Sequence, residues 1–244
     1  MKAANFRQRR INAKYRELLP KLREKFGEIK AHEKHWEDKR IFADYNVAFR
    51  FGSGHDIVHE MKGMHSTVKR KLRILEDGSG GGQFIGTLKS VLESEGIPSE
   101  TTATTLHDNY FLSILKKEGL IDNVVKGAME LYVPERPVDA IFSMMGSVNY
   151  TIGELRKDHA LKLANSLAPH GFMLVAFGFE DDKYSIKGGL SKKPKPKNVD
   201  TQTYFKGIEK AFAKHGFLAK IYRLRVRGSP NFGLLVKRAN PSRT

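Results

Sequence analysis

The chain has 244 residues, of which 40% are apolar, and it carries a formal net charge of +16 and no cysteine. This apolar content suits a folded globular protein and excludes general disorder. The absence of cysteine excludes disulfides, thiolate-bound metals, iron–sulfur clusters and every mechanism that uses a Cys nucleophile.

The sequence has neither the apolar length of a membrane span nor the pattern of a secretory leader. Its longest apolar run, Gly171 to Phe179, is about half of the roughly 20 residues that a bilayer span requires. No apolar core follows the N-terminal charges, and Glu17 and Glu24 disagree with the acid-poor composition of an organelle leader. We expect an intracellular, cytoplasmic protein without a membrane partner, with an organelle as the alternative. The oligomeric state is not indicated.

The positive charge is concentrated at the two ends of the chain. Residues 1–40 hold 13 basic and 6 acidic residues, and no acid follows Glu209. Clustered positive charge favours a polyanionic partner, so we expect contact with a nucleic acid. The alternative is a highly soluble surface without a specific partner.

Residues 1–50 are predicted to form a basic helical extension. Two apolar stripes of helical spacing are interrupted near Pro20, where a helix should break. Basic side chains lie between the stripes, and they supply three candidate RNA-binding residues, Arg7, Arg9 and Arg10. The stretch Phe49 to Gly54 has the composition of a turn, which places a domain boundary near residue 50.

In the second predicted domain, residues 51–244, short β-like runs alternate with helical ones. Strands are expected at residues 72–76, 102–107, 123–129, 137–144 and 171–179, and helices near residues 55–70, 83–95, 109–118, 153–168 and 201–214. Two final β runs, residues 218–227 and 232–238, are separated by Gly-Ser-Pro-Asn, which is a hairpin spacing. The pattern predicts an α/β fold with a doubly wound, mostly parallel seven-stranded sheet and a C-terminal antiparallel hairpin.

A glycine-rich segment, Glu-Asp-Gly-Ser-Gly-Gly-Gly, runs from Glu76 to Gly82 directly after the first of these strands. Glycine permits a tight turn and lets a ligand approach the backbone closely. In an open α/β sheet, ligands bind beyond the carboxyl ends of the strands, which is where this turn is expected. The spacing departs from the dinucleotide fingerprint, because Gln83 stands three positions after Gly80.

The segment resembles the cofactor loop of class I (Rossmann-like) S-adenosylmethionine-dependent methyltransferases, in which an acid precedes glycines at alternate positions. The resemblance covers about residues 55–238, and it implies a methyltransferase with S-adenosylmethionine as its cofactor. It also implies a set of cofactor-binding residues: Glu76, Gly78, Gly80, Gly82, Asp108 and Met129. Asp108 follows the second strand and is expected to accept the ribose hydroxyls. Where the family often has an Asp beside the adenine, this chain has Gly127-Ala128-Met129. For Glu76 and Asp108, a surface acid or a helix cap is the alternative.

The resemblance and the composition together limit the methyl acceptor. Without cysteine, methylation at a pyrimidine C5 and radical methylation are excluded. The fourth strand ends in Ser143-Met144-Met145-Gly146, which matches neither base-amine methyltransferases nor the ribose enzymes of the Lys-Asp-Lys-Glu type. An acceptor that is already nucleophilic remains, and for it positioning is the main requirement. Ser143, Asn149 and Tyr150 are the candidate catalytic residues that orient it, and Tyr150 is alternatively a core aromatic.

Basic segments near the expected ligand edge favour a large anionic substrate. Lys193 and Lys195 lie in a Lys-Pro loop that should remain extended along phosphates. The alternation of the sixth strand places Arg223, Arg225 and Arg227 on one face, where they contact RNA or protect an edge strand.

We therefore expect a methyltransferase that acts on RNA or a ribonucleoprotein. One alternative is a catalytically silent, methyltransferase-like RNA-binding module, such as a ribosome-associated or assembly protein. Another is a small-molecule or protein methyltransferase whose basic surface is incidental. The histidines suggest no metal site. His32 and His35 are one residue short of the His-Glu-x-x-His spacing of zinc proteases, and His55 and His59 have no third ligand in the pattern.

Overall fold

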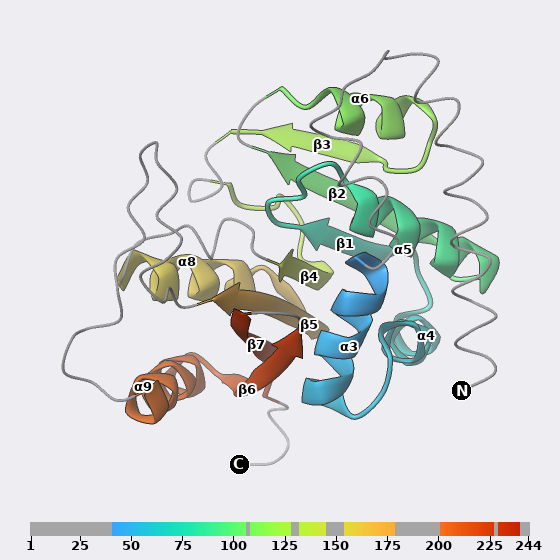
Figure 1. The fold of residues 1–244 in the computed structure, drawn as a ribbon. Coiled ribbons are helices and arrows are strands. Elements are labelled where there is room, and N and C mark those ends of the chain that lie inside the picture. Colours follow the sequence, from blue (N-terminus) through green and yellow to red (C-terminus); the bar gives the residue numbers. More distant parts are fainter. Residues whose placement is uncertain are drawn as a thin grey trace.

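A seven-stranded sheet forms the centre of the protein, with strand order β3-β2-β1-β4-β5-β7-β6 (Figure 1). The computed structural model describes residues 41–105, 108–127, 132–144, 154–178, 201–226 and 229–239. The strands are β1 (Leu72–Glu76), β2 (Ser99–Thr105), β3 (Asn123–Lys126), β4 (Val138–Met144), β5 (Leu167–Gly178), β6 (Phe217–Val226) and β7 (Ser229–Arg238). The helices are α3 (Ile41–Ser53), α4 (Ile57–Val68), α5 (Gln83–Ser94), α6 (Tyr110–Lys117), α8 (Glu154–Asn165) and α9 (Thr201–Lys214).

The chain builds the sheet outward from β1 in both directions. It first adds β2 and β3 on one side, and then returns to add β4 and β5 on the other, all in parallel pairings. The last strand, β7, inserts between β5 and β6 and is antiparallel to both. The predicted fold class is confirmed. Strands are added on one side of β1 as far as β3 and on its other side from β4 onward. The position between β1 and β4 is therefore a topological switch point, where ligands of open α/β sheets bind.

Helices cover both faces of this sheet. Successive strand residues point to opposite faces, so each strand presents apolar side chains to the helices on both sides. Leu72 and Ile74 of β1 pack with α3, α4, α5 and α6 on one face, while Leu75 packs with α8 and α9 on the other. Each fully buried aliphatic or aromatic side chain contributes roughly 1.5–3 kcal/mol. These two apolar layers hold the strand ends, and with them the turn after β1, in a fixed position.

Helix α3 is fixed to the C-terminal hairpin by Tyr222 of β6. The Tyr222 hydroxyl donates a hydrogen bond of 2.8 Å to the carbonyl oxygen of Ala48. Two glycines make room for its ring, since an added Cβ would lie 2.7 Å from the ring at Gly52 and 2.4 Å from it at Gly233. Burial raises the pKa of Tyr222. The helix is therefore part of the α/β body.

The structure differs from the sequence expectations in two places. The boundary expected at Phe49 to Gly54 coincides with the end of α3, which runs without a break through residue 50. Its residue Phe49 is fully buried, so the turn-like composition marks the end of a packed helix. In the hairpin, Val226 pairs with Ser229 and Arg225 pairs with Pro230, so most of Gly-Ser-Pro-Asn belongs to β7.

Of the basic extension expected over residues 1–50, residues 1–40 lie outside the described residues, and residues 41–50 belong to α3. Within the ranges that the structure does describe, no helix has the length and apolar character needed to cross a bilayer.

Candidate cofactor site

The glycine-rich turn between β1 and α5 adopts a backbone that requires glycine. Gly78, Gly80 and Gly82 have φ angles of +73°, +52° and +76°, a region that other residues rarely adopt. An added Cβ at Gly82 would lie 2.6 Å from Leu112 Cδ2, so this glycine lets α5 pack closely against α6. At Gly80 no atom of the described residues lies within 4 Å of such a Cβ. Open space therefore adjoins the backbone of Gly80, as a ligand-binding turn requires.

The turn is tied to the end of β2 by a small network of hydrogen bonds. The amide of Gly78 donates to Thr104 Oγ1 over 2.9 Å, and the amide of Ser79 donates to the carbonyl oxygen of Thr104 over the same distance. The Ser79 hydroxyl in turn donates to the carbonyl oxygen of Glu76 over 2.8 Å. Since Ser79 and Thr104 are both buried, the turn is rigid before any ligand arrives.

Asp108, the residue expected to bind the ribose, precedes Asn109, which contacts this turn. Its neighbour Asn109 caps α6 by accepting from the amides of Phe111 and Leu112, and Asn109 Nδ2 donates to the carbonyl oxygen of Gly80 over 2.6 Å. The Asp108 side chain is 90% exposed and accepts an ion pair of 2.6 Å from Lys126 at the end of β3. The Asp108 carboxylate is therefore accessible to solvent, one residue before the side chain that contacts the glycine turn, and its part in ribose binding stays a prediction.

Glu76, the last residue of β1, lies beneath the turn and is only 3% exposed. Tyr45 of α3 donates a hydrogen bond of 3.0 Å to Glu76 Oε1, whereas Oε2 has no hydrogen-bond partner. Burial raises the pKa of Glu76 to about 8, and the hydroxyls of Tyr45 and Ser79 and the amide of Ile85 oppose this rise only in part. Such a perturbed carboxyl group at a strand end is typical of a functional site.

Ser143, at the end of β4, points into the interior. Its side chain is fully buried, and its hydroxyl donates to Asp77 Oδ2 over 2.9 Å. His159 of α8 is also buried, with Nε2 at 3.8 Å from the same carboxylate oxygen. In this arrangement Ser143 joins the ends of β1 and β4, next to the cofactor turn, and its part in orienting an acceptor stays a prediction.

The remaining expected site residues are not placed by the structure. Those outside the described residues are Arg7, Arg9, Arg10, Met129, Asn149, Tyr150, Lys193, Lys195 and Arg227, and the side chain of Arg225 is likewise not described. Arg223 is exposed on β6, at the edge of the sheet, while its neighbour Leu224 is buried, as the alternation predicts. Within the described ranges, no group of three or more His, Cys, Asp or Glu side chains is arranged to hold a metal ion.

Sequence reasoning missed several residues that this site contains. Asn109 had a detectable signal, because an Asn directly before a helical run is a typical N-cap. Lys126 had the weaker signal of lying at the end of a predicted strand. Tyr45 had none, since its contact with Glu76 depends on how α3 packs across 31 residues of chain.

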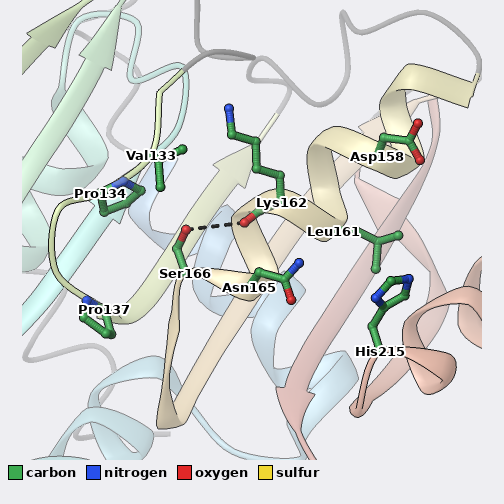
Figure 2. A pocket seen from close by; sticks show the side chains of 9 residues that line it. All are labelled: Val133, Pro134, Pro137, Asp158, Leu161, Lys162, Asn165, Ser166 and His215. Carbon is green, nitrogen blue, oxygen red and sulfur yellow. Dashed lines mark hydrogen bonds between the residues drawn. The ribbon is translucent and has the colours of Figure 1, made fainter.

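A hollow of about 530 Å³ lies at the opposite edge of the sheet (Figure 2). It is lined by Val133, Pro134, Pro137, Asp158, Leu161, Lys162, Asn165, Ser166 and His215. Pro137 precedes β4, Ser166 precedes β5 and His215 precedes β6, so this hollow lies at the amino ends of the strands. The glycine turn lies at the carboxyl ends, where open α/β sheets bind their ligands. We therefore place the candidate site at the glycine turn.

No protein-family model matches the chain, and no curated protein matches it by sequence. Its fold does match solved structures. A methyltransferase from Clostridium acetobutylicum that depends on S-adenosylmethionine aligns with a TM-score of 0.53 at 14% identity, over 86% of this chain and 99% of that chain. The fold is that of a class I methyltransferase.

Two further structures with the class I methyltransferase fold were solved with nucleoside ligands. The Burkholderia thailandensis 1,6-didemethyltoxoflavin-N1-methyltransferase, with 1,6-didemethyltoxoflavin and S-adenosylhomocysteine bound, has a TM-score of 0.52 at 14% identity, over 92% of this chain and 90% of that chain. LepI in complex with S-adenosylmethionine also has a TM-score of 0.52, at 12% identity, over 75% of this chain and 46% of that chain. Three features among the described residues suit such a ligand: the open space at Gly80, the carboxylate oxygen Oε2 of Glu76 without a hydrogen-bond partner, and the exposed carboxylate of Asp108.

Proposed function

We propose that the protein is an S-adenosylmethionine-dependent methyltransferase whose cofactor binds against the glycine turn. The observation that carries this proposal is the left-handed backbone of Gly80, which adjoins open space at the switch point of a class I methyltransferase sheet. When bound, the cofactor supplies a methyl group on a sulfonium, which a nucleophilic acceptor attacks directly.

In this proposal, residues of the chain bind the cofactor and orient the methyl acceptor. Asp108 accepts hydrogen bonds from the two ribose hydroxyls, and Glu76 binds the amino-acid end of the cofactor. Met129 packs against the adenine, and Asn149 and Tyr150 orient the acceptor. Because the sulfonium is already activated, holding the acceptor in line with the methyl group is the main catalytic contribution of the protein.

The acceptor that we propose is RNA or a ribonucleoprotein. The support is the net charge of +16 and its concentration at the ends of the chain. In the described part of the basic C-terminal region, Lys210, Lys214 and Arg223 are exposed. Lys237 and Arg238 serve the fold instead, since Lys237 pairs with Glu60 and Arg238 donates to the carbonyl oxygen of Leu167. A small-molecule acceptor, of the kind bound to the Burkholderia enzyme, is the alternative.

Calorimetry with S-adenosylhomocysteine tests the cofactor half of this proposal. We expect a dissociation constant of about 1–100 μM, and a loss of most of the binding heat in Asp108→Ala. Absence of heat with the intact protein favours a catalytically silent module.

Incubation with labelled S-adenosylmethionine and total cellular RNA or protein, followed by locating the label, tests the acceptor. A salt titration of RNA binding supports it: six to ten phosphate contacts weaken binding by ~10³–10⁵ between 50 and 200 mM salt. A flat response to salt, with label in a small molecule, contradicts the RNA acceptor and leaves the cofactor site intact.

A further inference from the structure

The two carboxylate oxygens of the buried Glu76 side chain differ in their hydrogen bonding. Oε1 accepts the hydroxyl of Tyr45 over 3.0 Å, whereas Oε2 has no hydrogen-bond partner among the described residues although the side chain is only 3% exposed. Such burial of a carboxylate oxygen is costly, because the nearby Ser79 hydroxyl and Ile85 amide compensate for its lost hydration only in part. A ligand that brings a cationic donor to Oε2 removes this cost.

Tyr45 is held so firmly that it fixes the direction of the Glu76 carboxyl group. Its ring stacks on Phe84 with 3.7 Å between the ring centroids and 13° between the planes, and it meets Phe142 edge-on at 6.0 Å. The other half of α3 is anchored by the hydrogen bond of Tyr222 to Ala48. Tyr45 therefore cannot leave Oε1 without disturbing a packed aromatic cluster.

Burial and a neighbouring charge favour the neutral form of Glu76 before a ligand binds. Asp77, the next residue along the chain, adds negative charge to the effect of burial. Tyr45 from α3, Ser79 from the turn and the amide of Ile85 from α5 are neutral donors that lower the pKa and offset these effects only in part. His159 of α8 faces Asp77, at 3.8 Å from Oδ2. Among the described residues, the Lys and Arg ion pairs are made with other carboxylates and not with Glu76, so the ammonium of a ligand is a suitable partner for it.

We propose that Tyr45 is a positioning residue of the cofactor site, which holds Oε1 of Glu76 so that Oε2 receives the ammonium of the cofactor's amino-acid end, and that this binding releases one proton. The inference rests on the proposed function. The balance is simple: the neutral carboxyl of Glu76 gives its proton to solvent, and the carboxylate pairs with the ammonium that the ligand already carries. No bond other than O–H is broken.

This coupling predicts a particular dependence of affinity on pH. Below about pH 8 the protein must give up the proton of Glu76, so affinity falls about tenfold per pH unit between pH 7 and pH 6. Above about pH 8 most of the unliganded protein has already lost the Glu76 proton, so binding no longer releases one. Net proton release is therefore about one at pH 6 and falls toward zero above pH 8.

Calorimetry in two buffers of different ionisation enthalpy measures this proton directly. The probe is S-adenosylhomocysteine, which carries the amino-acid end and is not turned over. We expect release of about 0.9 proton at pH 7. 5′-Methylthioadenosine, which lacks the amino-acid end, is the control ligand and should release none.

Three substitutions separate the positioning role from a merely structural one. In Tyr45→Phe the hydroxyl that stabilises the ionised carboxyl is lost, so we expect about tenfold weaker binding at pH 7 and a proton-release curve moved to higher pH. Tyr222→Phe removes the other tyrosine hydroxyl that contacts α3, and it should leave affinity within about twofold and proton release unchanged. Glu76→Gln should abolish proton release and weaken S-adenosylhomocysteine, while 5′-methylthioadenosine binds as to the unmodified protein.

The outcomes distinguish this inference from the proposed function. Binding of S-adenosylhomocysteine with no proton release at pH 6 to 7 overturns the inference and leaves the methyltransferase proposal standing. Equal effects of Tyr45→Phe and Tyr222→Phe overturn the role of Tyr45. No binding of either nucleoside overturns both proposals together.

Discussion

The side-chain amide of Asn109 donates a hydrogen bond of 2.6 Å to the carbonyl oxygen of Gly80, which joins the first turn of α6 to the glycine turn after β1. The same side chain accepts from the amides at the start of α6, so one residue caps a helix and positions a ligand-binding backbone. The two functions use different atoms of the amide group, and they can be separated by substitution.

Asn109→Asp should keep the helix cap and lose the link to Gly80, because a carboxylate accepts hydrogen bonds but donates none. We expect a melting temperature close to that of the unmodified protein and about tenfold weaker binding of S-adenosylhomocysteine. Asn109→Ala should show the same loss of affinity and a further ~1 kcal/mol loss of stability from the missing cap. Chemical denaturation and calorimetry measure the two effects, and unchanged affinity in both variants argues against a role of the link in binding.

The ion pair between Asp108 and Lys126 predicts opposite effects for its two partners. Asp108→Asn should weaken cofactor binding about 10- to 100-fold, because charge-assisted hydrogen bonds to the ribose are lost. Lys126→Met should leave binding intact or strengthen it up to about fivefold, since Lys126 competes for the same carboxylate and an exposed pair is worth at most about 1 kcal/mol. A comparable loss of affinity in both variants indicates that Lys126 itself contacts the ligand.

The two glycines at positions 80 and 82 should respond differently to alanine. Both have positive φ angles, so each substitution carries backbone strain of about 1 kcal/mol. Gly82→Ala adds a clash with Leu112 and Leu115, which are buried, and we expect a total loss of about 2–3 kcal/mol. Gly80→Ala meets no protein atom, so its main effect should be on the ligand, with at least tenfold weaker binding. Thermal unfolding and calorimetry on both variants test this division.

Sequence patterns were sufficient for the fold and for the cofactor turn, because both depend on local signals. Alternation of strand and helix gives the layers, and glycines after a strand give the turn. The contact between Tyr45 and Glu76 has no local signal, since it forms only when α3 packs on α5. The turn-like stretch Phe49 to Gly54 misled the prediction for the same reason: composition marks where a helix ends, but the burial of Phe49 shows that the helix belongs to the body.

Ser143 illustrates a second limit of reading the sequence. A polar residue at the end of β4 was expected to face the acceptor, as strand ends at this edge often do. At a strand end, one step along the chain decides between facing outward and facing inward. Here Ser143 faces inward and donates to Asp77, which directly follows β1, and His159 of α8 lies near the same Asp77 carboxylate. The alternation of residues along a strand assigns side chains to two faces of the sheet. It does not indicate which hydrogen-bond partners lie on each face.

Glu76 should make the protein less stable as pH rises from 5 to 8. Folding raises the pKa of this group from 4.5 to about 8 through burial, so in this range the folded state holds a proton that the unfolded state has lost. The free energy of unfolding then falls by up to about 1.4 kcal/mol per pH unit, and the fall levels off above about pH 8.

Glu76→Gln keeps the shape of the side chain and cannot ionise. It should therefore remove this dependence on pH and be more stable than the unmodified protein at pH 7. Urea denaturation at pH 5, 6, 7 and 8 measures both slopes, with Tyr222→Phe as a control that keeps the slope. If the unmodified protein and Glu76→Gln show the same dependence of unfolding free energy on pH, Glu76 is not buried in its neutral form. If the slope disappears and binding of S-adenosylhomocysteine weakens in the same variant, the protein retains a destabilising group at this position because the ligand needs it.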